Sequence, residues 1–242
     1  MPEMRSLTNS DLITLWERGS GMHPLDRGLL VLNTAFPDSR VQVADWILGQ
    51  RNQALLELHC SLFGARLQAW AVCESCGEKM EFTLNARGFL QQSNAAGEDA
   101  TVEFNGQTFR LPTSRDLAAA SRQADVEQAA MKLIELCSRN AGGSHRSNVK
   151  QWTSEDLEQV GDKMALADPL AEIRLAIACP ACESESVETV DVTSFLWAKI
   201  EGCAKRLLWE VHTIASAYGW TESEVLALGP TRRARYVEMA QA

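Results

Sequence analysis

Two segments of the chain alternate apolar and polar residues, and each contains a Cys-x-x-Cys sequence. In the first, Met80, Phe82 and Leu84 alternate with polar residues directly after the letters CESCGEK. In the second, the same alternation precedes the letters CPAC and returns at Val190 and Val192. A period of two is typical of strands that have one buried face. We therefore predict two β-hairpins, each with a Cys-x-x-Cys sequence in its turn.

Most of the remaining chain has apolar residues spaced as in amphipathic helices. From Phe195 to Tyr218 the apolar positions advance in steps of three and four, which predicts one long helix that ends at Gly219. Capping boxes, in which an acidic residue follows a threonine by three positions, predict helix starts at Thr8 and Thr221. Further helices are predicted to begin near Pro24, Val43, Thr113, Asp125, Thr153 and Pro230. The helix from Val43 is expected to continue to Phe63.

A third hairpin is predicted between the two cysteine segments. Asn105-Gly106 stands between alternating apolar residues, and this dipeptide favours the tight turn of a two-residue hairpin loop. Together these patterns predict an α+β fold that is mostly helical and has short β-hairpins.

The two cysteine segments repeat each other at a constant spacing. Cys179 follows Cys73 by 106 residues, and Cys182 follows Cys76 by the same 106 residues. The Phe-Leu dipeptide that closes each segment has the same offset. The pattern indicates a degenerate internal repeat, so we expect the two turns to have the same structure.

Two Cys-x-x-Cys turns that face each other can supply the four thiolates of a tetrahedral metal site. Four protein ligands leave no open position, so the metal bound by Cys73, Cys76, Cys179 and Cys182 would be structural. We expect zinc, although thiolate ligands suit iron as well. Two alternatives stay open at this point: a redox role for the pairs, or thiols that are not linked. A redox pair usually begins a helix, whereas both pairs here lie between predicted strands.

The repeat and the metal site together predict how the chain is divided. About a hundred residues separate the two pairs, so an entire insertion would be tied at its ends by the metal. The expected parts are an N-terminal helical region (residues 1–66), two zinc-ribbon-like halves (67–90 and 171–196), an inserted hairpin with helices (91–170) and C-terminal helices (197–242).

Charge and composition argue against several classes of protein. The 242 residues include 32 Asp and Glu against 23 Lys and Arg, a formal net charge of −9. Residues 71–192 alone carry 20 acidic and 11 basic residues. Phosphate backbones attract clustered Lys and Arg, so we expect no nucleic-acid partner. The first dozen residues contain no apolar run of signal-peptide length, and no stretch approaches the roughly 18 apolar residues of a membrane span. We expect an intracellular protein without membrane contact.

Sequence motifs of catalysis are missing. The chain contains no glycine-rich phosphate loop, no Gly-x-Ser-x-Gly elbow and no His-Glu-x-x-His sequence. Its four histidines lie far apart and in unrelated contexts. We therefore predict a protein that is not an enzyme.

Several stretches, taken in order, resemble one family. They are LTNSDLITLWERGSGMHPLDRGLLVL, WILGQRNQALLELHCSLFGARLQAW, CESCGE, FRLPTSRDLAA, ADPLAEIRLAIACPAC and LWEVHTIASAYGWTESEVLALGPTRRARYVEM. These stretches span nearly the whole chain and resemble the T-even-phage-type baseplate hub assembly chaperones of contractile phage tails and related bacterial injection systems. The most specific pieces are LPTSRDL and the segment His-x-x-Ala-x-x-Tyr-Gly-Trp from His212 to Trp220.

The resemblance implies a non-catalytic assembly chaperone or a minor component of the baseplate or hub. Its implied partners are hub or wedge proteins. Its implied location is the cytoplasm of the bacterium or phage host, and a place in the assembled particle stays open. The alternative function is a zinc-ribbon protein-interaction module or thiol-redox protein unrelated to tails.

The C-terminal helices are the predicted partner-binding surface. They combine the most regular apolar stripe of the chain with aromatic and arginine side chains, which contribute much of the energy at protein interfaces. The candidate residues are Tyr218, Trp220, Arg232, Arg233 and Tyr236. In the free protein we expect the arginines to lie on a solvent-exposed helix face.

Overall fold

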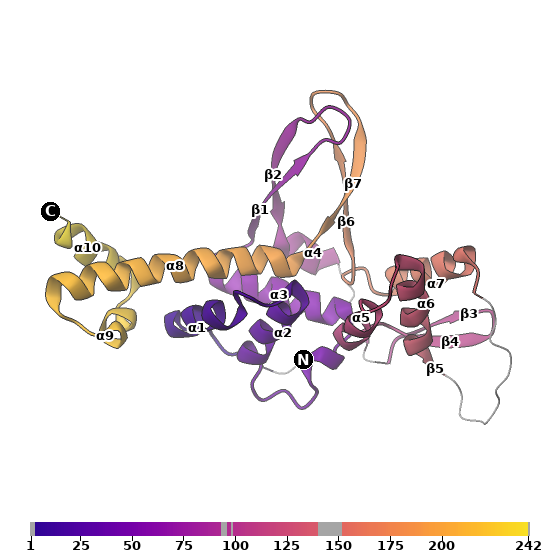
Figure 1. Cartoon of the computed structure of the whole chain (residues 1–242), viewed down its shortest axis with the longest axis horizontal. Coiled ribbons are helices and arrows are strands. Elements are labelled where there is room, and N and C mark those ends of the chain that lie inside the picture. The colour runs from indigo at the N-terminus through magenta and orange to yellow at the C-terminus, as the bar shows by residue number, and fades with distance from the viewer. Residues whose placement is uncertain (1–2, 93–95, 98, 140–151, 242) are drawn as a thin grey trace. The chain divides into compact units, whose positions relative to one another are not determined.

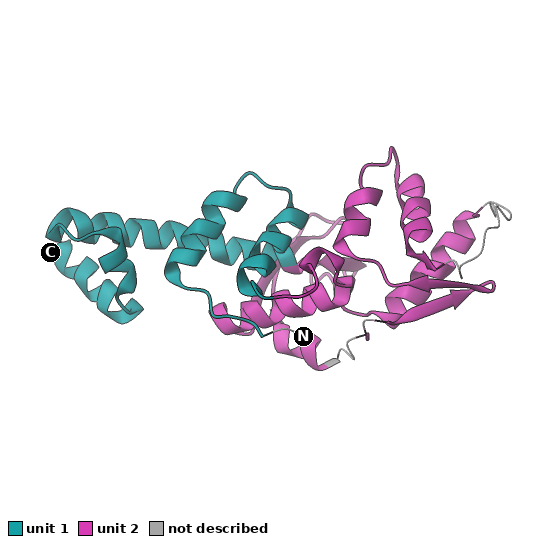
Figure 2. Cartoon of the chain, turned by 90° about the horizontal axis from the view of Figure 1, so that it is seen from below, with its two compact units in different colours: residues 1–38, 193–242 teal, residues 39–192 magenta. Residues whose placement is uncertain are grey.

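The computed structural model describes residues 3–92, 96–97, 99–139 and 152–241. Its fold is α+β and mainly helical, with short antiparallel hairpins, as the sequence predicts. By packing, the chain divides into two compact units, shown in Figure 2. Unit 1 comprises residues 1–38 and 193–242, and unit 2 comprises residues 39–192. The finer division into five parts stays a prediction.

Unit 1 is built from helices at both ends of the chain. They are α1 (Asn9–Gly19), α2 (Pro24–Ala35), α8 (Val192–Tyr218), α9 (Glu222–Ala227) and α10 (Pro230–Ala240). The capping boxes predicted at Thr8 and Thr221 both form, because each threonine hydroxyl accepts a hydrogen bond from the backbone N–H three residues later. Gly219 has a φ of +71° and follows the last residue of α8, as expected for the residue that ends this helix.

Two apolar clusters hold the helices of unit 1 together. Ile13 of α1 packs against Ala204 and Leu207 of α8. Farther along α8, Ile214 packs against Val225 of α9 and Val237 of α10. The long helix therefore carries the N-terminal helices on one part of its length and the C-terminal helices on another.

Unit 2 contains the remaining elements, which Figure 1 shows in chain order by colour. They are the 3₁₀ turn η1 (Val43–Asp45), α3 (Leu48–Phe63), β1 (Arg66–Val72), β2 (Lys79–Asn85), α4 (Ala86–Gln92), β3 (Thr101–Phe104), β4 (Gln107–Arg110), α5 (Ser114–Ala120), α6 (Val126–Cys137), β5 (Ser138–Arg139), α7 (Ser154–Ala167), β6 (Ile173–Ala178) and β7 (Glu185–Val190). Of the described helices, none is both long and apolar enough to cross a membrane.

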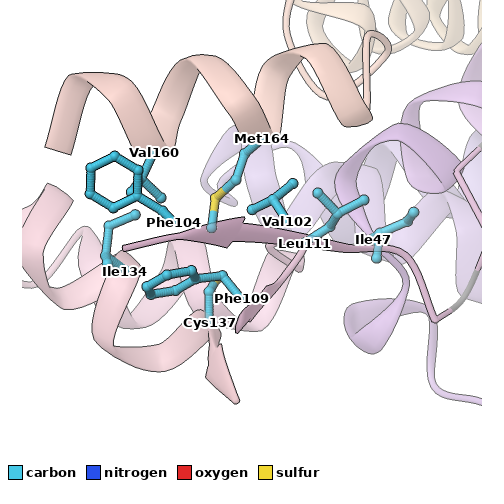
Figure 3. Packing of buried hydrophobic residues seen from close by; sticks show 9 residues of the cluster. All are labelled: Ile47, Val102, Phe104, Phe109, Leu111, Ile134, Cys137, Val160 and Met164. Carbon is cyan, nitrogen blue, oxygen red and sulfur yellow. The ribbon is translucent and has the colours of Figure 1, made fainter. Parts of the chain in front are cut away.

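The predicted hairpin at Asn105-Gly106 is confirmed. Strands β3 and β4 pair on either side of the dipeptide, and both turn residues have positive φ, +50° and +74°. Strand β5 adds to β4 and completes a three-stranded antiparallel sheet. The core of this part surrounds Phe109, which is completely buried, and Figure 3 shows Val160 and Met164 projecting from α7 toward the strands.

The third predicted helix begins later than the sequence indicated. Residues 43–45 form only the 3₁₀ turn η1, and α3 starts at Leu48. The backbone in between is extended because it hydrogen-bonds elsewhere: Ile47 bridges to Thr113, and the Leu48 N–H donates to the Pro112 carbonyl at 3.0 Å. A helix cannot include residues whose backbone groups are committed to a distant segment.

The N-terminus of α3 is capped by a side chain from the residue that follows α7. Asp168 is 3% exposed and accepts a hydrogen bond from the Gly49 N–H at 2.8 Å. A Cβ added at Gly49 would lie 1.7 Å from an Asp168 carboxylate oxygen, so only glycine fits here. One turn later, the Asn52 side chain donates to the Leu170 carbonyl at 2.7 Å. The start of α3 and the segment after α7 are therefore joined by buried hydrogen bonds.

Gly49→Ala is expected to lower the free energy of unfolding by about 1–3 kcal/mol, because the new methyl group would displace the carboxylate that caps α3. The matched control is Gly161→Ala in α7, where a new Cβ would meet no atom within 4 Å. Alanine is the better helix former, so the control should be more stable than wild type by about 0.5–1 kcal/mol. Urea unfolding followed by circular dichroism measures both, and equal stability of the two variants would contradict the role given to Asp168.

Candidate functional site

Both predicted cysteine hairpins are present in unit 2. Strand β1 pairs with β2, and β6 pairs with β7, each antiparallel and each with its Cys-x-x-Cys in the connecting turn. Figure 1 shows the two hairpins side by side with their turns at the same end. Their facing sides share a small apolar cluster in which Ala71 and Met80 of the first hairpin pack with Ile177 of the second.

The two turns have the same backbone hydrogen bonds. In the first turn, the Cys73 N–H donates to the Glu78 carbonyl at 2.9 Å, and the Gly77 N–H donates to the Cys73 carbonyl at 2.8 Å. The second turn has the same two bonds, each 2.9 Å long, between the residues 106 positions later. The fifth residue of each turn has positive φ: +77° at Gly77 and +60° at Glu183. The repeat found in the sequence is therefore a repeat of structure.

The four predicted ligands come together at the tips of the hairpins. The Cys73 and Cys182 sulfurs are 3.6 Å apart, and the Cys76 and Cys179 sulfurs are 3.7 Å apart. All four sulfurs lie within 4.8 Å of one another. Four sulfurs at the usual zinc–sulfur bond length of 2.3 Å would be about 3.8 Å apart at the corners of a tetrahedron. The arrangement therefore fits a metal ion bound by four thiolates.

The neighbours of Cys73 and Cys76 shift the pKa values of these two thiols in opposite directions. The Ser184 hydroxyl, with nearby amides, lowers the pKa of Cys73 to about 6. The Glu78 amide lowers the pKa of Cys76, but Cys182, loss of contact with water and the other two thiols outweigh this effect and raise the pKa to about 12. Like charges this close disfavour ionisation.

Ser184 is a residue at this site that the sequence analysis did not identify. Its hydroxyl oxygen lies 3.2 Å from the Cys73 sulfur and 3.3 Å from the Cys182 sulfur. The repeat gives no signal for it, because Glu78 stands at the equivalent position of the first turn. Only its place two residues after Cys182 connects it with the ligands.

The five partner-binding candidates lie in unit 1, and three of them touch. The rings of Tyr218, Trp220 and Tyr236 contact one another, with centroids 4.8–5.6 Å apart. Arg232 is exposed on α10. Whether these residues bind a partner stays a prediction.

The expectation that the arginines form a solvent-exposed face is wrong for Arg233. This side chain is only 2% exposed, and its Nε donates to the Glu210 carboxylate at 2.7 Å. A second guanidinium nitrogen donates to the Leu228 carbonyl. The ion pair satisfies the buried charge and connects α10 with α8, which explains why the residue is not in solvent.

Comparison with protein families shows a similarity over more than half of the chain. The family model described as T4 bacteriophage base plate protein matches residues 31–197, a range that holds all four clustered cysteines and both of their hairpins. No curated protein and no solved structure matches the chain.

The fifth residues of the two turns allow a matched test of the hairpin geometry. Gly77→Ala is expected to lower the free energy of unfolding by about 1–2 kcal/mol, because a side chain disfavours positive φ. Glu183→Gly should raise it by roughly 0.5–1 kcal/mol, because the lost strain exceeds the entropy that glycine adds to the unfolded chain. Thermal unfolding at fixed zinc concentration measures both changes. Destabilisation by both substitutions would show that the two turns are not equivalent.

Proposed function

Since this chain belongs to the family of T4 bacteriophage base plate proteins, we propose that it is a non-catalytic assembly chaperone or minor component of the baseplate or hub of a contractile phage tail or phage-tail-like injection system. Its proposed partners are hub or wedge proteins. Membership in this family argues against the alternative function, a protein-interaction module or thiol-redox protein unrelated to phage tails.

The same proposal includes one structural zinc ion bound by Cys73, Cys76, Cys179 and Cys182, which makes the two hairpins a zinc-ribbon-like unit. The observation that carries it is the set of four sulfurs within 4.8 Å of one another, supplied by equivalent turns 106 residues apart. Such a site has no free coordination position for a substrate, which agrees with a role in structure rather than catalysis.

The metal would supply most of the stability of the paired hairpins. A two-stranded hairpin is only marginally stable by itself, and the apolar cluster between these two is small. Structural zinc contributes on the order of 10–16 kcal/mol in small zinc-dependent folds. Binding between the turns would also join the two ends of the segment from Cys76 to Cys179, which includes the three-stranded sheet and α5 to α7.

Exposed aromatic side chains support a role in binding proteins. On β1, Trp70 is 79% exposed and lies on the opposite strand face from Ala71, which packs against the other hairpin. On α8, Trp209 is 47% exposed. Tryptophan and tyrosine are enriched at the energetic centres of protein interfaces. The charge of the chain agrees with a protein partner, because its excess of carboxylates disfavours phosphate backbones.

Protein purified without chelator is expected to contain one zinc per chain, measured by inductively coupled plasma mass spectrometry. Cys73→Ser combined with Cys179→Ser should contain none, because it removes one ligand from each turn. Its hairpins should lose cooperative unfolding, since zinc binding contributes folding energy.

The matched control for this double variant is Cys60→Ser combined with Cys203→Ser. Both cysteines are partly exposed and lie outside the four-cysteine cluster. The control should keep one zinc per chain. Wild-type protein free of metal would refute the zinc site and leave the baseplate role supported by the family match alone.

The C-terminal surface is tested with Tyr218→Ala combined with Arg232→Ala, both exposed residues. We expect binding to a co-purified baseplate hub protein to weaken at least about tenfold, because truncated interface anchors commonly cost more than 1 kcal/mol. Isothermal titration calorimetry measures the affinity, and zinc content should not change.

The control for this experiment is Arg18→Ala combined with Met22→Ala, which alters exposed residues of unit 1 outside the C-terminal helices. This variant should bind the hub protein as wild type does. Equal affinities for wild type and the Tyr218 and Arg232 variant would place the partner surface elsewhere.

A further inference from the structure

The hydroxyl of Ser184 links the two cysteine turns. Its oxygen lies 3.2 Å from the sulfur of Cys73 in the first turn and 3.3 Å from the sulfur of Cys182 in its own turn. These sulfurs form one of the two close sulfur pairs, at 3.6 Å. Ser184 precedes β7, and its carbonyl accepts the turn hydrogen bond from the Cys179 N–H at 2.9 Å. The residue is therefore held in position by its backbone while its side chain faces the sulfurs.

The direction of the hydrogen bond follows from the chemistry of the ligands. A metal-bound cysteine sulfur carries no proton, so it can only accept a hydrogen bond. The serine hydroxyl must then donate, and its single proton is shared between two thiolates. Donors that bond to metal ligands fix their orientation and tune the metal, and their removal typically lowers metal affinity about 10- to 100-fold.

Only one of the two repeated turns provides this hydroxyl contact. Moving by 106 residues exchanges Cys73 with Cys179 and Cys76 with Cys182, so the Cys73–Cys182 pair corresponds to the Cys76–Cys179 pair. The residue equivalent to Ser184 is Glu78, whose side chain has no hydroxyl to donate. Both turns do have the equivalent amide contacts, from Glu78 to Cys76 and from Ser184 to Cys182. The hydroxyl is thus a difference between two otherwise matching halves.

From this geometry we infer that Ser184 is a positioning residue of the metal centre: it donates a hydrogen bond to the thiolates of Cys73 and Cys182 and strengthens metal binding on that side. The inference rests on the proposed zinc site. The two halves of the repeat then have unequal roles, because only the second turn supplies a side chain that donates a hydrogen bond to the cysteine ligands.

The test is a Co²⁺ titration of the full chain, followed by competition with Zn²⁺. Ser184→Ala is expected to bind Co²⁺ about 10- to 100-fold more weakly than wild type. Its sulfur-to-cobalt charge-transfer band should move to longer wavelength, because thiolates without the hydrogen bond release electron density more readily. Ser184→Thr keeps a hydroxyl and should restore both the affinity and the band position.

The matched control is Ser75→Ala in the first turn. Ser75 has an alanine as its equivalent, Ala181, and the substitution keeps the backbone amide next to Cys73. Its affinity and spectrum should match those of wild type. A general effect of removing a serine near the metal would appear in this variant as well.

The repeat also provides a test in the opposite direction. Glu78→Ser places a hydroxyl at the equivalent position of the first turn, whereas Glu78→Ala only removes the negative charge. We expect Glu78→Ser to bind Co²⁺ at least about threefold more tightly than Glu78→Ala and to shift the charge-transfer band to shorter wavelength.

The outcomes separate this inference from the zinc site. Wild-type protein that binds neither Co²⁺ nor Zn²⁺ would overturn both. Tight binding by wild type, with the same affinity and spectrum for Ser184→Ala, would leave the zinc site intact and overturn the role of Ser184. A loss of affinity in Ser184→Ala that Ser184→Thr does not restore would also overturn it.

Discussion

Four sulfur atoms from two distant turns meet at one point, and the paired hairpins of unit 2 depend on this contact. The sulfurs lie within 4.8 Å of one another, a separation at which four thiolates repel strongly unless a cation lies between them. Elsewhere the hairpins share little apolar surface. Both turns have the same pair of backbone hydrogen bonds, so the two halves of the cluster are built on equivalent backbones.

Local features of the fold could be predicted because their physical causes lie within a few residues. Each capping box consists of two side chains three positions apart, and the Asn105-Gly106 turn needs only its own positive φ values. The meeting of the four cysteines was predictable for a related reason, because the constant offset of 106 residues indicated that two distant turns are copies. Each turn supplies two of the four thiols that a tetrahedral site needs, so two equivalent turns were expected to lie together.

The features that the sequence did not reveal depend on contacts between distant residues. The start of α3 is set by the backbone bonds of Ile47 and Leu48 to residues 112 and 113. Its cap, Asp168, lies 119 residues from Gly49, and no local sequence pattern indicates either contact. Arg233 looked like one of several surface arginines, but its pairing with Glu210 depends on how α10 folds back on α8. Ser184 was missed because the repeat places a glutamate at the matching position. In each case the residue type is common at protein surfaces, and only its position in the folded chain gives it the structural role.

The meeting of the two cysteine turns at the ends of the segment from Cys76 to Cys179 has a consequence for how proteins of this kind can diverge. When the ends of a segment are fixed, each doubling of its length costs only about 0.6 kcal/mol of closure entropy. Most of the buried cluster around Phe109 comes from residues between Cys76 and Cys179, and Ile47 completes it from outside that segment. Changes of length in the loops of this segment therefore cost little, whereas Pro112 and Asp168, which bond to the start of α3, have to keep their places. The loops of the segment can thus acquire new binding surfaces without altering the cysteine turns or the bonds to α3.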